Sequence, residues 1–154
     1  MTWQFEHLTF RKNQEDVVEL NEALQFLTGQ HSSVVTSVAS SGAAQSTVVR
    51  AGPYEGQMAF VVRDDTTKLR NLSMNPNCTV LTVTPDWRKY ATVEGHAALH
   101  TPDNTDAEEL RLLLRAVFAA AGGTHDNWDE FDRVMKDERR AAVLVTPDRI
   151  YGRV

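Results

Sequence analysis

Between residues 33 and 99 the chain carries five runs in which apolar and polar side chains alternate and β-branched residues predominate. A period of two is typical of strands with one buried face, so the pattern predicts strands at residues 33–39, 45–51, 57–62, 79–84 and 90–99. The turns between the first three runs, at residues 40–42 and 52–56, are short and contain glycine. Such turns indicate antiparallel hairpins, because a parallel crossover needs a dozen or more residues.

A sixth strand is predicted at residues 142–146. Six short, mostly antiparallel strands with a few helices outside them favour a mainly β (α+β) fold built as a small barrel. Closure of the barrel also removes the unpaired edges that an open six-stranded sheet would expose.

Three segments have the apolar spacing of amphipathic helices. The first runs from Val17 to Leu27, the second occupies residues 105–121 before a Gly-Gly pair, and the third occupies residues 126–139. Thr105 and Glu108 are spaced as a capping box for the second helix. In the third, Asp132 and Lys136 stand four residues apart, the spacing of an ion pair within one helix. A short insert at residues 64–72 predicts two further helical turns.

The length of 154 residues predicts a single domain over residues 1–154. A net charge of −5 gives no electrostatic reason to expect a nucleic-acid partner. The N-terminal residues do not form a secretory signal, and no apolar stretch is long enough for a membrane span. One cysteine, Cys78, excludes an internal disulfide and fits a reducing cytoplasm.

Familiar catalytic and nucleotide-binding motifs are missing: there is no glycine-rich dinucleotide fingerprint, P-loop, nucleophile elbow or zinc-protease motif. His96 and His100 are four apart, but on a strand this separation is roughly 13 Å, too long for two ligands of one metal ion. We therefore predict no metal site. Cys78 is expected to be a small buried apolar residue, and no catalytic residue can be named.

The insert at residues 64–72 is the most informative segment for ligand binding. It opens a short helix with Thr66, Thr67 and Lys68, and a helix N-terminus with hydroxyls and a lysine suits a phosphate group. The alternative is purely structural: Asp65 or Thr66 caps the helix and Lys68 is solvated. Further basic side chains stand at Arg50, at the end of a predicted strand, and at residues 88–89, before another.

The order of these segments resembles the pyridoxamine 5′-phosphate oxidase-like flavoproteins, which have a split β-barrel, and more closely their branch that uses the deazaflavin coenzyme F-420. The resemblance rests on FVVRDDTTK at residues 60–68, on Leu72, on Asn75-Pro76, on the strand at residues 80–83 and on Val93-Glu94-Gly95. It covers about residues 17–100.

The resemblance implies a homodimer with the cofactor in a groove between two barrels. It implies that Lys68, with Thr66 or Thr67, binds the cofactor phosphate, and that the stretch from Ser46 to Arg50 contacts the ring. The cofactor-binding residues expected in this way are Ser46, Thr47, Val48, Arg50, Thr66, Thr67, Lys68, Lys89 and Tyr90.

Two departures narrow the expected activity. Oxidases that act on pyridoxamine phosphate have an Arg-Gln pair where this chain has Lys89-Tyr90, and they end in a different substrate motif. Both differences argue against that substrate, and the aromatic Tyr90 is closer to the deazaflavin branch. The chain also carries a long helical insert, residues 102–139, which either covers a substrate pocket or packs on the barrel.

The expected function is therefore hydride transfer between F-420 and a small or conjugated organic substrate. The alternatives are an FMN-binding oxidase or reductase of the same fold and a non-catalytic carrier of flavin or haem. A dimeric scaffold without a cofactor is a third. Whether the enzyme uses F-420 or FMN, the cofactor supplies the redox chemistry. The sequence is therefore not expected to contain a set of catalytic acid, base or nucleophile residues.

Overall fold

The computed structural model describes residues 18–154. Its elements are, in chain order, α1 (Leu20–Thr28), β1 (Ser32–Val38), β2 (Ala44–Tyr54), β3 (Gln57–Arg63), α2 (Thr67–Met74), β4 (Asn77–Val83), β5 (Tyr90–His100), α3 (Ala107–Ala120), α4 (Trp128–Asp137) and β6 (Arg140–Arg153). All the predicted strands and helices are present. Val17, where the first helix was expected to begin, lies outside the described residues.

The six strands form a closed barrel in the order β1-β2-β3-β6-β5-β4, and every neighbouring pair is antiparallel. The predicted fold class is confirmed. The barrel interior is filled by apolar side chains that are at most 1% exposed, among them Val35, Met58, Phe60, Val80, Val93 and Val143. Burial of such side chains stabilises the fold by roughly 1.5–3 kcal/mol each.

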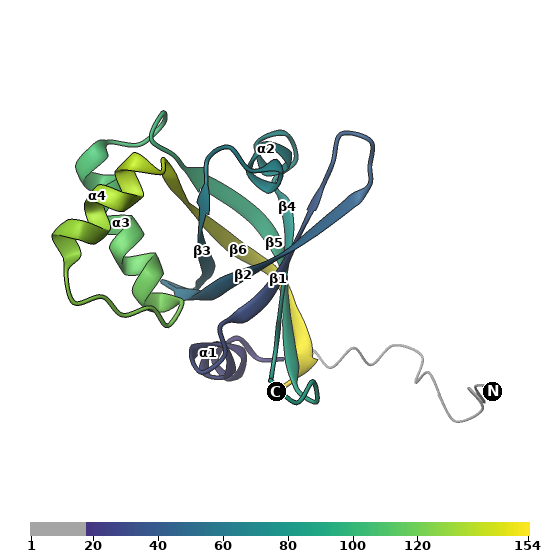
Figure 1. Ribbon diagram of the computed structural model, residues 1–154. Coiled ribbons are helices and arrows are strands. Elements are labelled where there is room, and N and C mark those ends of the chain that lie inside the picture. Colours follow the sequence, from purple (N-terminus) through teal and green to yellow (C-terminus); the bar gives the residue numbers. More distant parts are fainter. Residues whose placement is uncertain (1–17) are drawn as a thin grey trace, which may run out of the picture.

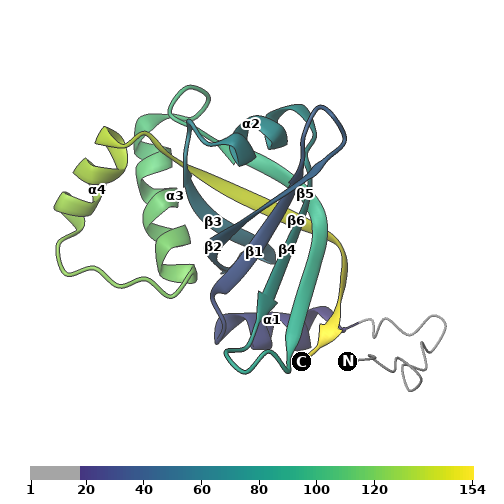
Figure 2. The same ribbon diagram turned by 45° about the vertical axis from the view of Figure 1, so that its right-hand side comes forward.

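The helices are distributed unevenly around the barrel (Figure 1). α3 and α4 lie together against the outside of β3 and β6, while α1 and α2 lie near opposite ends of the barrel, as Figure 2 also shows. A second apolar cluster, which includes Ala59, Leu110, Leu114, Val117, Phe131 and Leu144, joins α3 and α4 to the barrel. Because β3 and the first half of β6 are covered on both faces, residues 58–62 and 141–145 are continuous apolar runs.

Local boundaries differ from the sequence predictions for identifiable reasons. The cap of α3 is Asp106, whose carboxylate accepts hydrogen bonds from the backbone of Glu108 and Glu109, so the predicted Thr105 capping box is wrong. The last strand continues beyond Thr146 to Arg153. Pro147 looks like a strand terminator, but it pairs with Gly95 where the β5–β6 register shifts, a position that tolerates a missing N–H.

β2 leaves β3 halfway along its length. The two strands pair only from Ala51 to Tyr54, whereas residues 44–50 of β2 pair with β1 alone. The β1–β2 hairpin consequently projects from the barrel, as Figure 1 shows. One edge of β2 at residues 44–50 therefore presents backbone N–H and C=O groups to the space beside β3.

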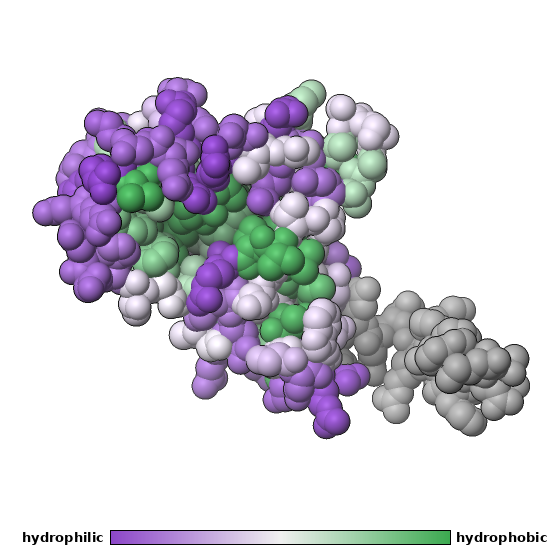
Figure 3. All heavy atoms as spheres, in the orientation of Figure 1, coloured by the Kyte–Doolittle hydropathy of each residue, from purple (hydrophilic) through white to green (hydrophobic). Residues whose placement is uncertain are grey.

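Within residues 18–154, no helix covers the outer face of the barrel where β1, β2 and β4 cross (Figure 1). On this face Val34 of β1 lies between Val48 of β2 and Leu81 of β4 in the cross-strand register. Val48 is 79% exposed, and Val34 and Leu81 are half-buried. Figure 3 shows hydrophobic surface where β1, β2 and β4 cross in Figure 1.

Candidate functional site

A cleft of about 420 Å³ opens where β2 separates from β3. β2 and β3 form two of its walls, the start of α2 a third, and the ends of the α3–α4 hairpin a fourth. Its lining residues are Val48, Val49, Arg50, Val61, Val62, Arg63, Thr66, Lys68, Phe118, Ala121, Gly123, Met135 and Arg140. Figure 3 shows a recess with hydrophobic walls between the helical lobe and the barrel.

The start of α2 places Lys68 in this cleft. Thr66 caps the helix: its hydroxyl accepts a hydrogen bond from the backbone of Leu69 and donates one to the carbonyl of Arg63. The structural role predicted for Thr66 is thus confirmed. Lys68, in the first turn of the helix, is half-buried, and this burial lowers the pKa of its ammonium group. No carboxylate of the described residues contributes to that shift.

Arg50 lines the cleft, but its guanidinium is directed at α3. Its Nε and Nη2 both donate to the carbonyl of Ala121, at 3.4 and 3.3 Å, so Arg50 binds the C-terminal end of that helix. A cation at a helix C-terminus is favourable because the last carbonyls carry partial negative charge. Arg50 therefore fixes the position of the cleft wall at residues 121–123.

The wall of β3 and β6 contributes two further cations. Arg63 and Arg140 are directly opposite each other in the β3–β6 register. Each contacts a carboxylate two positions away in the sequence: Arg63 binds Asp65 at 3.1 Å, and Arg140 binds Glu138 at 2.8 Å. The cleft lining thus holds four basic side chains and no acidic one.

Of the nine residues expected from the sequence, the cleft brings together Val48, Arg50, Thr66 and Lys68. The others lie elsewhere in the single chain. Ser46 is exposed and hydrogen-bonds to Thr36 on the outer face of the hairpin. Thr47 carries a buried hydroxyl without a hydrogen-bond partner among the described residues. Thr67, the first residue of α2, is exposed.

Lys89 and Tyr90 stand at the other end of the barrel from α2. They belong to the β4–β5 turn, where Thr84 and Lys89 exchange hydrogen bonds, and Tyr90 pairs with Arg153 near the C-terminus. Figure 2 shows this turn at the end of the barrel that α1 occupies. A single chain therefore does not place these two residues in the cleft.

Sequence reasoning missed the residues that complete the walls: Arg63, Phe118, Met135 and Arg140. Arg63 was within the recognised motif, but its neighbour Arg140 is 77 positions away in the chain. Phe118 lies within the helix predicted at residues 105–121, whose apolar spacing indicates only that one face is buried. Only the packing of α3 and α4 on the barrel puts its ring at the cleft.

The described residues offer no metal cluster, no reactive thiol and no helix that could span a membrane. No group of three or more His, Cys, Asp or Glu side chains in residues 18–154 could hold a metal ion. Burial raises the pKa of the Cys78 thiol to about 12, so the thiolate is not available at neutral pH. No helix in the described part of the chain is long and apolar enough to cross a membrane.

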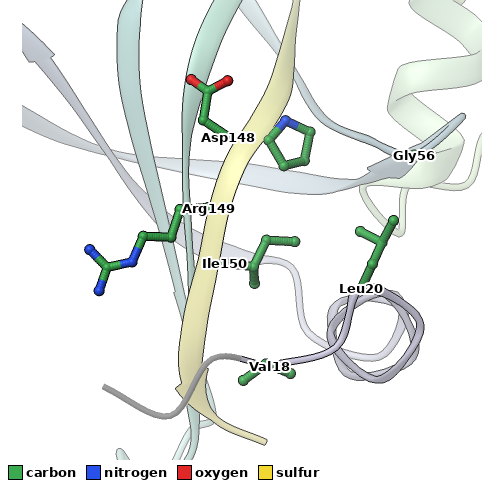
Figure 4. Close-up of a pocket in the computed structure, with 7 residues that line it drawn as sticks. Val18, Leu20, Gly56, Asp148, Arg149 and Ile150 are labelled. Atoms are coloured by element: carbon green, nitrogen blue, oxygen red, sulfur yellow. The ribbon is translucent and has the colours of Figure 1, made fainter. Parts of the chain in front are cut away.

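Two other hollows differ in chemistry from the cleft. One of about 490 Å³ lies between α1 and β6, where Val18, Leu20 and Ile150 surround an apolar space and Arg149 points away from it (Figure 4). A larger groove of about 840 Å³ lies between α3 and α4. Its rim is held by Asp132, which accepts hydrogen bonds from Arg115 at 2.8 Å and from Arg111 at 3.0 Å.

The comparisons with known proteins agree with this architecture. The sequence profile of the pyridoxamine 5′-phosphate oxidase family matches residues 20–153. Among solved structures, a conserved hypothetical protein from Mycobacterium tuberculosis superposes with a TM-score of 0.72 at 16% identity, covering 92% of this chain and 88% of its own. At this identity the match shows the fold alone.

Two further structures carry functional names. An F420 reductase superposes with a TM-score of 0.60 at 18% identity, covering 82% of this chain and 94% of its own. A heme binding protein from Mycobacterium smegmatis superposes with a TM-score of 0.63 at 15% identity, covering 88% of this chain and 54% of its own. The shared fold is therefore found with more than one kind of cofactor.

Proposed function

The chain belongs to the pyridoxamine 5′-phosphate oxidase family, and we propose that it is an oxidoreductase that binds the deazaflavin coenzyme F-420 in the cleft between β2 and β3. In this proposal it transfers hydride between the coenzyme and a small or conjugated organic substrate. The supporting observation is the combination, in one cleft, of a free strand edge, an apolar wall and four cations without an acidic lining residue.

The residues present suit a flat ring with an anionic tail. The free edge of β2 at residues 44–50 offers backbone donors and acceptors, which are what the polar edge of a flavin-type ring requires. Val48, Val61 and Phe118 provide apolar surface for the face of the ring. A cofactor of this type thus finds partners for both its ring and its phosphate.

The phosphate is assigned to the start of α2. The Thr66 hydroxyl is already occupied by the backbone of Arg63 and Leu69, so Thr66 orients the helix. Lys68 remains available as a charged donor, and the first N–H groups of a helix lack intrahelical partners. Lys68 is half-buried and has no carboxylate partner within residues 18–154, so a bound phosphate would supply its counterion.

The bound coenzyme would supply hydride transfer itself. Val48, Val61 and Phe118 would hold the ring and keep water from the face that they cover. No side chain has to act as acid or base, which fits a cleft without a carboxylate or histidine in its lining.

We further propose that the protein is a homodimer. The uncovered face formed by Val34, Val48 and Leu81 is apolar, and Val48 belongs to both this face and the cleft. A second copy packed on this face would border the cleft. Lys89 and Tyr90 of that copy could then reach the ligand in the cleft, which these residues do not do within a single chain. Sedimentation velocity tests this, with a dimer expected.

The deciding experiment is a fluorescence titration of the purified protein with F-420 and, separately, with FMN. Tight binding of F-420, and a rise in the absorbance of the oxidised coenzyme when the reduced coenzyme is mixed with protein and a reducible conjugated substrate, would support the proposal. Tight binding of FMN alone would replace F-420 by FMN. Binding of F-420 or FMN with no turnover would indicate a carrier, and binding of neither would refute a role that depends on either cofactor.

A further inference from the structure

The pair formed by Arg63 and Arg140 is not accounted for by a single phosphate site at Lys68. The two arginines are direct cross-strand partners on β3 and β6, and both line the cleft. Like charges placed opposite each other in an antiparallel pair destabilise it. Stability alone would therefore favour an uncharged residue opposite one of the two arginines.

The neighbouring carboxylates satisfy only part of this cationic pair. Glu138 occupies Nε and Nη2 of Arg140, and Asp65 occupies Nη2 of Arg63. A guanidinium has five N–H donors, so donors remain on both side chains. Asp65 is itself 64% exposed, and a contact of that kind is weak and readily exchanged for another anion.

Acidic groups that could neutralise the pair from further away are engaged. Asp64, next to Arg63, accepts from Arg139 at 2.8 Å, and that arginine also binds Asp103. The arginine pair therefore keeps a positive potential beside Lys68 and within the same cleft.

We infer that Arg63 and Arg140 form a second anion-binding subsite, which takes a negatively charged group that lies beyond the phosphate held by Lys68. The inference rests on the proposed function and adds the ligand class: a ring-bearing cofactor whose tail carries either further phosphate or carboxylates. FMN ends at its one phosphate, whereas FAD carries a diphosphate and F-420 carries glutamyl carboxylates beyond a phosphodiester.

The test compares the wild type with the double variant Arg63→Gln, Arg140→Gln. Arg70→Gln, an exposed arginine on α2 outside the cleft lining, serves as the control for a lost positive charge. Each protein is titrated with FMN, FAD and F-420 by fluorescence. The double variant is expected to bind F-420 or FAD about tenfold more weakly, with less than a twofold change for FMN.

The separate titrations show which anion the subsite binds. A loss of affinity in the double variant for F-420 alone identifies carboxylates, and a loss for FAD alone identifies a second phosphate. An equal loss for FMN, an equal loss in Arg70→Gln, or no loss would overturn the subsite. Thermal unfolding with inorganic tripolyphosphate gives a readout that needs no flavin. Stabilisation by tripolyphosphate that the double variant loses would uphold the subsite even if no flavin bound and the proposed function failed. If no flavin bound and both proteins were stabilised equally, both ideas would be wrong.

Discussion

Gly52 is the residue at which a single methyl group is expected to disturb both the fold and the cleft. It lies in β2, where the strand passes under the last turn of α3. A Cβ built on Gly52 would be 1.8 Å from the carbonyl oxygen of Ala120 and 2.9 Å from the backbone nitrogen of Ala121. These are backbone atoms, so no side-chain rotation can relieve the overlap.

The expected loss in the free energy of unfolding follows from the displacement that Gly52→Ala requires. Real Cβ atoms essentially never come closer than 3.0 Å to another heavy atom, so the Ala120 carbonyl must withdraw by about 1.2 Å. Overpacking of a well-packed contact costs roughly 1–3 kcal/mol. The same shift weakens the hydrogen bonds from Arg50 to Ala121, each worth roughly 0.5–1.5 kcal/mol. We expect a total loss of about 2–4 kcal/mol in the free energy of unfolding.

The assay is equilibrium unfolding in urea, with Gly29→Ala as the matched control. A Cβ on Gly29 would be 3.8 Å from its nearest neighbour, and the residue has a φ of −97°, which alanine adopts without strain. That variant should be within about 0.5 kcal/mol of the wild type or slightly more stable. A loss in Gly52→Ala below about 0.5 kcal/mol, or equal to that of Gly29→Ala, would refute the close approach of α3 to β2.

Three further outcomes test the site, the interface and the helical lobe. Lys68→Ala should weaken the binding of F-420 or FMN about tenfold in a fluorescence titration, while Arg70→Gln leaves it unchanged. Because burial lowers the pKa of Lys68 below its ordinary 10.5, wild-type affinity should fall as the pH rises through that lowered pKa, and an identical alkaline fall in Lys68→Ala would contradict the assignment. Leu81→Glu places a charge on the uncovered face and should convert the proposed homodimer to a monomer in sedimentation velocity; a dimer that persisted would contradict the proposed interface. Asp132→Asn should lower the free energy of unfolding by about 1–2 kcal/mol at pH 7. Arg115 first, and Arg111 with it, hold the pKa of the Asp132 carboxyl below its usual value, so this contribution is present above the unfolded-state pKa of about 4 and is lost as the pH falls below it. A difference between Asp132→Asn and the wild type that persisted at low pH would contradict this origin.

Much of the secondary structure could be predicted because its signals are local. Alternation along residues 33–39 and 79–84, and the turns that follow, report which side chains face inward over a few positions. The phosphate-type signal at Thr66 and Lys68 is also local, and the structure places both residues in the cleft. The end of β6 was predicted too early, at residue 146, because a proline usually ends a strand. Pro147 instead continues the strand and pairs with Gly95.

Ion pairing shows where local reasoning fails. The spacing of Asp132 and Lys136 suggests a pair within α4, yet Asp132 binds Arg111 and Arg115 of α3. The two helices pack against each other. Solvent screens the attraction between charges across a packed interface less than the attraction between charges on an exposed helix face. No spacing within one helix reports this choice.

The sequence by itself determined the elements of this protein, the antiparallel sense of its hairpins and one side of its candidate phosphate site. Tertiary structure alone decided that β2 parts from β3 after four paired residues, that Arg50 turns to the end of α3, and that Arg63 faces Arg140. Strand propensity and capping act between residues a few positions apart, whereas a cleft is the space between segments that are distant in the chain. Its walls are set by which faces pack together, and that is a property of the closed barrel as a whole.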